Sequence, residues 1–188
     1  MNEQNFLKRT EFFVTGDGFW RGIEIPLREA YLHADGATLT TILSTNPGYS
    51  MADTNLLALT WAAGKVVKGG INVHIPGDYD ESRDECKVWV LVKSGGSTDT
   101  PTLTFEAFKA SAPTTDLAPD ATAAIGATFA WREVDLDGNS ILANETLGLT
   151  IVPGTHGTDT VEIVAIKLRY RSDLVMNAEA ERSSGTPS

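Results

Sequence analysis

The sequence predicts an all-β protein, an antiparallel jelly-roll-like β-sandwich with an extended N-terminal arm. In residues 86–93, Cys86, Val88, Val90 and Val92 alternate with more polar or bulkier residues, which is the period of a half-buried strand. Similar short stretches follow one another from about residue 56, separated by Gly, Pro, Asp and Asn. No segment has the period of an amphipathic helix. Long connections between some strands favour a jelly roll, with an immunoglobulin-like sandwich as the second choice.

Composition divides the chain into three parts. Residues 1–50 are predicted to be an N-terminal arm with one or two strands, at 21–29 and 38–43, because aromatic residues are dense there but Gly and Pro interrupt them. Residues 51–172 form the predicted jelly-roll sandwich, and residues 173–188 a polar, flexible tail. The arm packs either on its own sandwich or on neighbouring subunits, and the sequence leaves both alternatives open.

Seven strands are predicted in the sandwich, at 57–61, 71–75, 86–93, 103–107, 128–136, 147–151 and 161–171. The turn after the third contains Gly95 and Gly96, which we expect to supply positive φ angles. Residues 110–124 are rich in Ala, Pro, Thr and Asp and predict a long crossing loop or a short helix. Asp137-Gly138-Asn139 is a strong turn signal.

Composition also excludes several classes of function. The net charge of −10 and the isoelectric point near 4.7 argue against binding to nucleic acid or to an anionic membrane surface. The single cysteine excludes an intrachain disulfide, and its place among valines predicts that Cys86 is buried. The N-terminus lacks the apolar segment of a signal peptide, which predicts a protein kept in a cytoplasm or released by lysis.

The sequence offers no catalytic motif. Its three histidines, His33, His74 and His156, accompany no nucleophile, phosphate loop or zinc motif of known spacing. The carboxylates of residues 78–85 could surround a hard cation, but a solvated loop is the preferred interpretation. We therefore predict no enzyme activity, no catalytic residue, no metal site and no cofactor.

Three groups of residues are candidates for contact with a partner or another subunit. One is the set of aromatics in the arm, and the second is the side of the strand at 86–93 that lies opposite the valines. The third is one side of the last strand, at 161–171, where three basic residues alternate with apolar ones. The basic residues either pair with cross-strand carboxylates such as Glu133 and Asp135 or face an acidic partner. The predicted interface residues are Phe6, Phe12, Phe13, Phe19, Trp20, Trp89, Leu91, Lys167, Arg169 and Arg171.

Four tryptophans, Trp20, Trp61, Trp89 and Trp131, also suggest carbohydrate binding, because sugar rings stack on exposed indoles. Trp61 shares a strand face with Leu57 and Leu59 and is predicted to belong to the core. Two coplanar tryptophans on an exposed face would favour the carbohydrate hypothesis.

Several stretches resemble small β-sandwich proteins that decorate or cement the capsids of tailed bacteriophages. They are LTWAAGKVVKGGINVHIPGDYD at 59–80, WREVDLDGN at 131–139, PGTHGTD at 153–159 and LRYRS at 168–172. The resemblance implies a virion structural protein, made in the host cytoplasm and displayed on the capsid surface, that binds and stabilises the shell. Its implied partners are the major capsid protein and further copies of this chain, as a homotrimer. The alternative function is a carbohydrate-binding β-sandwich module on a phage appendage.

Overall fold

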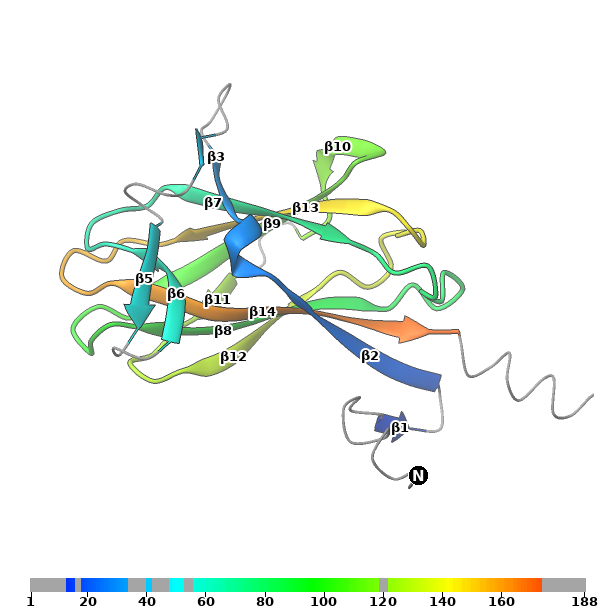
Figure 1. Ribbon diagram of the computed structural model, residues 1–188, viewed down its shortest axis with the longest axis horizontal. Coiled ribbons are helices and arrows are strands. Elements are labelled where there is room, and N and C mark those ends of the chain that lie inside the picture. Colours follow the sequence, from blue (N-terminus) through cyan, green and yellow to red (C-terminus); the bar gives the residue numbers. More distant parts are fainter. Residues whose placement is uncertain are drawn as a thin grey trace, which may run out of the picture.

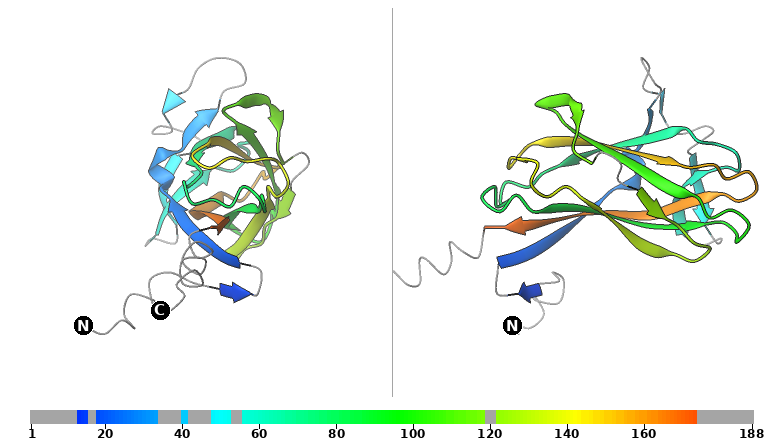
Figure 2. Two further views of the ribbon diagram at one scale, coloured as in Figure 1. Left: turned by 90° about the vertical axis from the view of Figure 1, so that its right-hand side faces the viewer. Right: turned by 180° about the vertical axis from the view of Figure 1, so that it is seen from behind.

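The computed structural model describes residues 13–15, 18–33, 40–41, 48–52, 56–118 and 122–173. These residues form two antiparallel β-sheets that stack face to face, and they contain no α-helix (Figures 1 and 2). The two-sheet sandwich confirms the predicted all-β fold class.

Sheet A contains seven strands in its described part, and β14 lies at its centre. The strand order is β1-β2-β14-β6-β5, and β14 also pairs with β8, which in turn pairs with β12. The strands are β1 (Phe13–Thr15), β2 (Gly18–Ile25), β5 (Gly48–Ala52), β6 (Leu56–Trp61), β8 (Cys86–Ser94), β12 (Ala130–Asp135) and β14 (Val161–Ser172).

One edge of β14 is shared by two strands. On one side β8 follows it from Val161 to Tyr170. On the other side the first three residues, 161–163, pair with β6, and residues 166–172 pair with β2. The register with β8 shifts between Ile163 and Ala165, so a β-bulge lies where β6 gives way to β2. The sheet therefore splits beside Val164 and Ala165.

Sheet B also has seven strands in its described part, in the order β10-β9-β13-β7-β3-β4, with β11 paired to β9. The chain reaches it from sheet A through β2, the short 3₁₀ helix η2 (Leu27–Glu29) and β3, a crossing that Figure 1 shows in blue. The strands are β3 (Tyr31–His33), β4 (Thr40–Thr41), β7 (Lys68–His74), β9 (Thr102–Lys109), β10 (Ala112–Asp116), β11 (Thr122–Ala124) and β13 (Thr146–Pro153).

The core lies between the facing sides of the two sheets. Cys86, Val88, Val90 and Val92 of β8 all point into it and are no more than 1% exposed. Burial raises the pKa of the Cys86 thiol to about 12, so this cysteine is an unreactive core residue, as predicted. Trp61 is fully buried and its indole N–H donates to the Val67 carbonyl at 2.7 Å, which confirms its predicted place in the core.

All seven strands predicted in the sandwich are confirmed, as β6, β7, β8, β9, β12, β13 and β14. The prediction for residues 110–124 was wrong, because they form β10 and β11, two short strands that both pair with β9. Exposed edge strands need no alternation of apolar residues, so their sequence lacks the usual signal. In β10, the Asp116 carboxylate accepts hydrogen bonds from the N–H groups of Ala107 and Ala118, which fixes a bulge.

Residues before position 50 contribute strands to both sheets. β2 pairs with β14, and β3 pairs with β7. The strand predicted at 21–29 begins earlier and ends at Ile25, because Pro26 lacks an N–H group to continue the ladder. The strand predicted at 38–43 is limited to Thr40–Thr41 in the described residues. The described part of the predicted arm thus pairs within its own chain.

Candidate binding face

The outward side of sheet A carries a continuous set of aromatic and basic side chains, which we call the aromatic–basic face. Residues directly opposite each other on paired strands share a face, and β8 has its valines on the inner side. The remaining β8 residues and their register partners on β12 and β14 therefore point outward, and so do the β2 residues opposite those of β14. The face consists of Trp20, Lys87, Trp89, Leu91, Trp131, Lys167, Arg169 and Arg171.

All three tryptophans of the aromatic–basic face are in contact with cations. Lys167 Nζ lies 5.1 Å from the ring centroid of Trp131, and Arg169 Cζ lies 4.4 Å from that of Trp89. Arg171 Cζ lies 4.5 Å from the ring centroid of Trp20. These distances are within the range of cation–π attraction, about 6 Å. Each tryptophan is thus held in place beside a positive charge from β14.

Trp89 and Trp131 are also in contact with each other. Their ring centroids lie 6.1 Å apart and the ring planes are inclined by 50°. Both side chains are partly exposed. The planes of the two rings are therefore inclined to each other. They are not the coplanar pair that would favour the carbohydrate hypothesis.

Carboxylates border the face at two sides. Lys87 Nζ lies 2.9 Å from Glu133 Oε1 and 3.4 Å from Asp135 Oδ2. The hydrogen bond from its ammonium group to Glu133 raises the pKa of Lys87. Lys167 pairs with Glu24 at 3.8 Å, and Arg171 pairs with Glu85. Glu133 and Asp135, proposed from sequence as cross-strand partners of the basic residues of the last strand, pair with Lys87, since β8 separates β12 from β14.

Asp137 lies next to this border, and its negative charge destabilises the folded protein. Burial and the nearby charge of Asp135 raise its pKa to about 6, although the Cys86 N–H donates to its Oδ1 at 2.7 Å. Between pH 3.8 and about 6 the unfolded chain loses a proton that the folded protein retains. The contribution of Asp137 to the free energy of unfolding therefore falls as pH rises through this window.

Replacing Asp137 with asparagine should stabilise the protein at pH 7. The amide oxygen can still accept from Cys86, while the charge is removed. Because the side chain is 33% exposed, screening limits the expected gain to about 1 kcal/mol. Denaturant unfolding at pH 7 and pH 3.5 measures it. The gain should vanish at the lower pH, and an equal gain at both values would contradict a charge effect.

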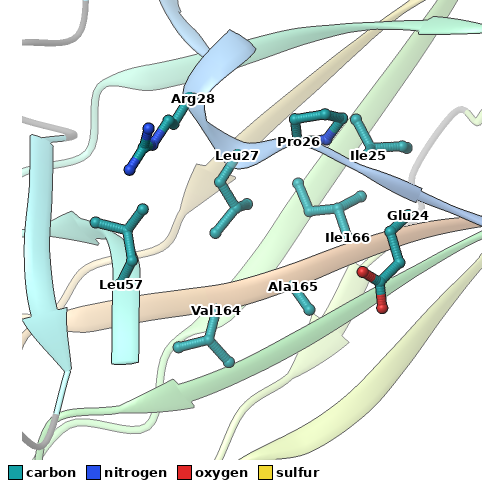
Figure 3. Close-up of a pocket in the computed structure, with 9 residues that line it drawn as sticks. All are labelled: Glu24, Ile25, Pro26, Leu27, Arg28, Leu57, Val164, Ala165 and Ile166. Carbon is teal, nitrogen blue, oxygen red and sulfur yellow. The ribbon is translucent and has the colours of Figure 1, made fainter. Parts of the chain in front are cut away.

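A pocket of about 400 Å³ lies beside the face, where β2 and β6 separate along β14 (Figure 3). Its lining is mainly apolar, and Glu24 and Arg28 stand at opposite ends of it in Figure 3. Glu24 also pairs with Lys167, so the pocket adjoins the aromatic–basic face. Glu24 is the only carboxylate in the lining, which holds no His, Cys or Ser among the described residues. It offers no pair of groups for acid–base catalysis.

The structure brings six of the ten predicted interface residues together on this face: Trp20, Trp89, Leu91, Lys167, Arg169 and Arg171. Phe19 neighbours Trp20 in β2 but alternation directs it to the other side. Phe13 lies in β1 with its backbone opposite Trp20, and Phe6 and Phe12 lie outside the described residues. The interface role of these residues stays a prediction.

Trp131 and Lys87 belong to the face but were not among the predicted interface residues. Both show the alternation of a strand, and the missing information was that β12 pairs with β8. Among the described residues, no group of three His, Cys, Asp or Glu side chains is placed to hold a metal ion. That part of the chain also has no helix of the length and apolarity needed to span a membrane.

The fold and this face define an antiparallel β-sandwich with an aromatic outer sheet surface. No protein-family model and no curated protein matches the chain. Among solved structures it is similar to a xylan-binding module, CBM15, with a TM-score of 0.53 and 14% identity over 79% of this chain and 95% of the module. It is also similar to Xylanase10C from Cellvibrio japonicus in complex with xylopentaose, with a TM-score of 0.53 and 13% identity over 79% of this chain and 28% of the xylanase. At these identities the likeness establishes the fold.

The comparisons contradict the predicted role in a phage capsid. The two similar structures named above are a xylan-binding module and a xylanase. The resemblance that suggested a capsid protein consisted of turn positions and strand lengths, which unrelated β-sandwiches share. No observation tests the predicted homotrimer, partner or virion location.

Proposed function

We propose that this protein binds carbohydrate through the aromatic–basic face. The observation that carries the proposal is the gathering of Trp20, Trp89 and Trp131 on one outward sheet surface of a sandwich similar to a xylan-binding module. Indole rings offer broad apolar faces for the C–H side of a sugar ring.

The geometry favours a twisted glycan chain. The planes of Trp89 and Trp131 meet at 50°, so sugar rings that lie flat against both must be turned relative to each other. Charged groups such as Lys167 and Glu24 lie beside the rings and can bond to hydroxyl groups. This arrangement suits binding without any chemical step.

The test is affinity electrophoresis of the protein through gels that contain soluble xylans, glucans, galactans or uronic-acid polymers. Retardation by at least one of them is expected. Trp131→Ala should weaken that binding about fivefold or more, because stacking on one aromatic ring contributes about 1–3 kcal/mol.

Leu142→Ala is the matched control. Leu142 is 51% exposed and lies outside the face, so its loss should leave retardation unchanged. Thermal melts of both variants verify folding, and Trp20→Ala provides a second probe of the same face. Absence of retardation by every polysaccharide, or equal retardation of wild type and both tryptophan variants, would refute the proposal.

A further inference from the structure

Basic residues are concentrated on the aromatic–basic face and its immediate border. The chain has 15 Lys and Arg residues and a net charge of −10. Five of them project outward from the adjacent strands β8 and β14, where their positions alternate with the valines and other core residues. They are Lys87, Lys93, Lys167, Arg169 and Arg171.

These five cations differ in how closely carboxylates approach them. At the border, Lys87 contacts Glu133 at 2.9 Å and Lys93 lies 3.6 Å from Glu162. Arg171, with a side chain only 9% exposed, pairs with Glu85. In the centre, Lys167 lies 3.8 Å from Glu24, whose own side chain is 80% exposed and well hydrated. Such an exposed, long ion pair is easily exchanged for another carboxylate.

Arg169 occupies the middle of the face. Its guanidinium carbon lies 4.4 Å from the ring centroid of Trp89 and 5.5 Å from that of Trp20. Opposite it on β2 is Gly22, which has no side chain to cover it. A planar guanidinium stacked on indoles can bond to a carboxylate in a bidentate way through its N–H edge.

We infer that the face selects acidic carbohydrate, glycans built from or decorated with uronic acids, an inference that rests on the proposed carbohydrate-binding function. A neutral sugar stacked on the indoles makes no use of the positive charges that Lys167 and Arg169 hold beside the rings. A uronic acid brings an apolar ring face to the indole and a carboxylate to the cation beside it. Both contacts then form without separating the cation from its tryptophan.

The net charge of the whole protein further restricts which acidic ligands this face can bind. A net charge of −10 repels polyanions at distances up to about a Debye length, about 8 Å at physiological salt. Charge alone therefore does not bring a polyanion to this surface. Recognition requires that one sugar unit supply both the stacking ring and the carboxylate.

The experiment compares acidic polysaccharides with their neutral counterparts of the same backbone. Glucuronoxylan, polygalacturonate and alginate are each tested before and after chemical reduction of their carboxyl groups, by affinity electrophoresis of the full chain. At least one acidic form should bind about tenfold or more tightly than its reduced product, a difference that retardation measures directly. Sodium polyglutamate and heparin test general attraction to polyanions.

Variants assign the effect to the face. Arg169→Gln and Lys167→Gln should each weaken binding to the acidic form about tenfold more than they weaken binding to the reduced form, so that the ratio of the two affinities approaches one. Lys65→Gln removes the same charge from an exposed turn outside the face and should change neither. If Arg169→Gln lowers the melting temperature, the result for Lys167→Gln is the one that tests the inference. The Lys167 side chain is 34% exposed and is not part of the core.

Each outcome separates the inference from the proposed function. Equal binding of acidic and reduced forms would overturn the preference for uronic acids while leaving carbohydrate binding in place. Polyglutamate bound as tightly as any uronic-acid polymer would assign the face to acidic polypeptides, and equal binding of heparin would show unselective attraction to polyanions. Failure of every polysaccharide, neutral or acidic, would refute both proposals.

Discussion

Replacing Asp78 with alanine is expected to lower the free energy of unfolding by about 2–4 kcal/mol. Asp78 lies in the connection between β7 and β8, and its side chain is 15% exposed. Its Oδ1 accepts a hydrogen bond from the Tyr170 hydroxyl at 3.0 Å, and its Oδ2 accepts from Ser172 at 2.6 Å and pairs with Arg21. One carboxylate thus joins the loop to β14 and β2.

The large effect comes from the groups that the substitution leaves behind. The Tyr170 side chain is 2% exposed, so its hydroxyl would lose its partner in a place that water reaches poorly. The guanidinium of Arg21 would lose its counter-charge. A buried group without a partner costs more than the net worth of the bond it made.

The pH dependence follows from the pKa of Asp78. Burial acts to raise it, but hydrogen bonds from Ser172, Arg21 and Tyr170 together hold it below its ordinary value of 3.8. A carboxylate with a lowered pKa stabilises the fold fully above the unfolded value and loses this effect as pH falls through the folded value. The difference between wild type and Asp78→Ala should therefore be constant near pH 7 and decrease below pH 3.8.

Guanidinium chloride unfolding measures both effects. Asp78→Asn keeps the size and one acceptor oxygen, and should lose less than the alanine variant. Glu24→Gln removes an exposed carboxylate that also pairs with a basic residue, and should change stability by no more than about 0.5 kcal/mol. A loss for Asp78→Ala as small as that of Glu24→Gln would show that the hydrogen bonds contribute nothing.

Strand positions could be predicted from sequence because their signal is local. In β8 the alternation of Cys86, Val88, Val90 and Val92 with Lys87, Trp89 and Leu91 decided correctly which side faces the core. It also indicated that Trp89 and Leu91 point away from the valine side, whereas their shared surface with the basic residues of β14 depends on the pairing of β8 with β14. The outward residues of each of these two strands were therefore predictable, one strand at a time.

Contacts between distant segments were not predictable in this way. The carboxylates of residues 78–85 were interpreted as a solvated loop, yet Asp84 accepts hydrogen bonds from the Tyr79 hydroxyl and the N–H of Ile141, at 2.9 and 3.0 Å. The addition of Trp131 to the face likewise depends on pairing between β12 and β8. Sequence alternation gives the side of a strand but not its neighbour, since many strand orders satisfy the same pattern.

Gly95 and Gly96 show the same limit at a turn. We predicted that they supply positive φ angles, but neither has a φ in the left-handed region. The reason for glycine is steric. A Cβ on Gly96 would lie closer than 3.0 Å to all three atoms of the Asp159 carboxyl group, and one on Gly95 would meet the Thr160 side chain. The partners come from the β13–β14 connection, about 60 residues later in the chain, where no local signal indicates them.

Substituting Gly96 with alanine is accordingly expected to cost about 2–3 kcal/mol in the free energy of unfolding. Asp159 Oδ2 accepts hydrogen bonds from the N–H groups of Thr98 and Asp99, both at 2.8 Å. The Asp99 carboxylate accepts in return from the N–H groups of Thr158 and Asp159. A methyl group at position 96 displaces the Asp159 carboxyl group and so breaks its hydrogen bonds with Thr98 and Asp99. These bonds join the β8–β9 connection to the β13–β14 connection.

Gly157→Ala is the matched control for this substitution. Gly157 lies in the same pair of loops, has no positive φ, and a Cβ placed on it would have no atom within 4 Å. Alanine there should leave stability unchanged or raise it slightly, because it restricts the unfolded chain. Thermal and denaturant unfolding of both variants measure the difference, and hydrogen exchange of the Thr98 and Asp99 amides should accelerate only in Gly96→Ala. Equal stability of the two variants would mean that Asp159 moves aside at no cost, so that close packing is not what requires glycine at position 96.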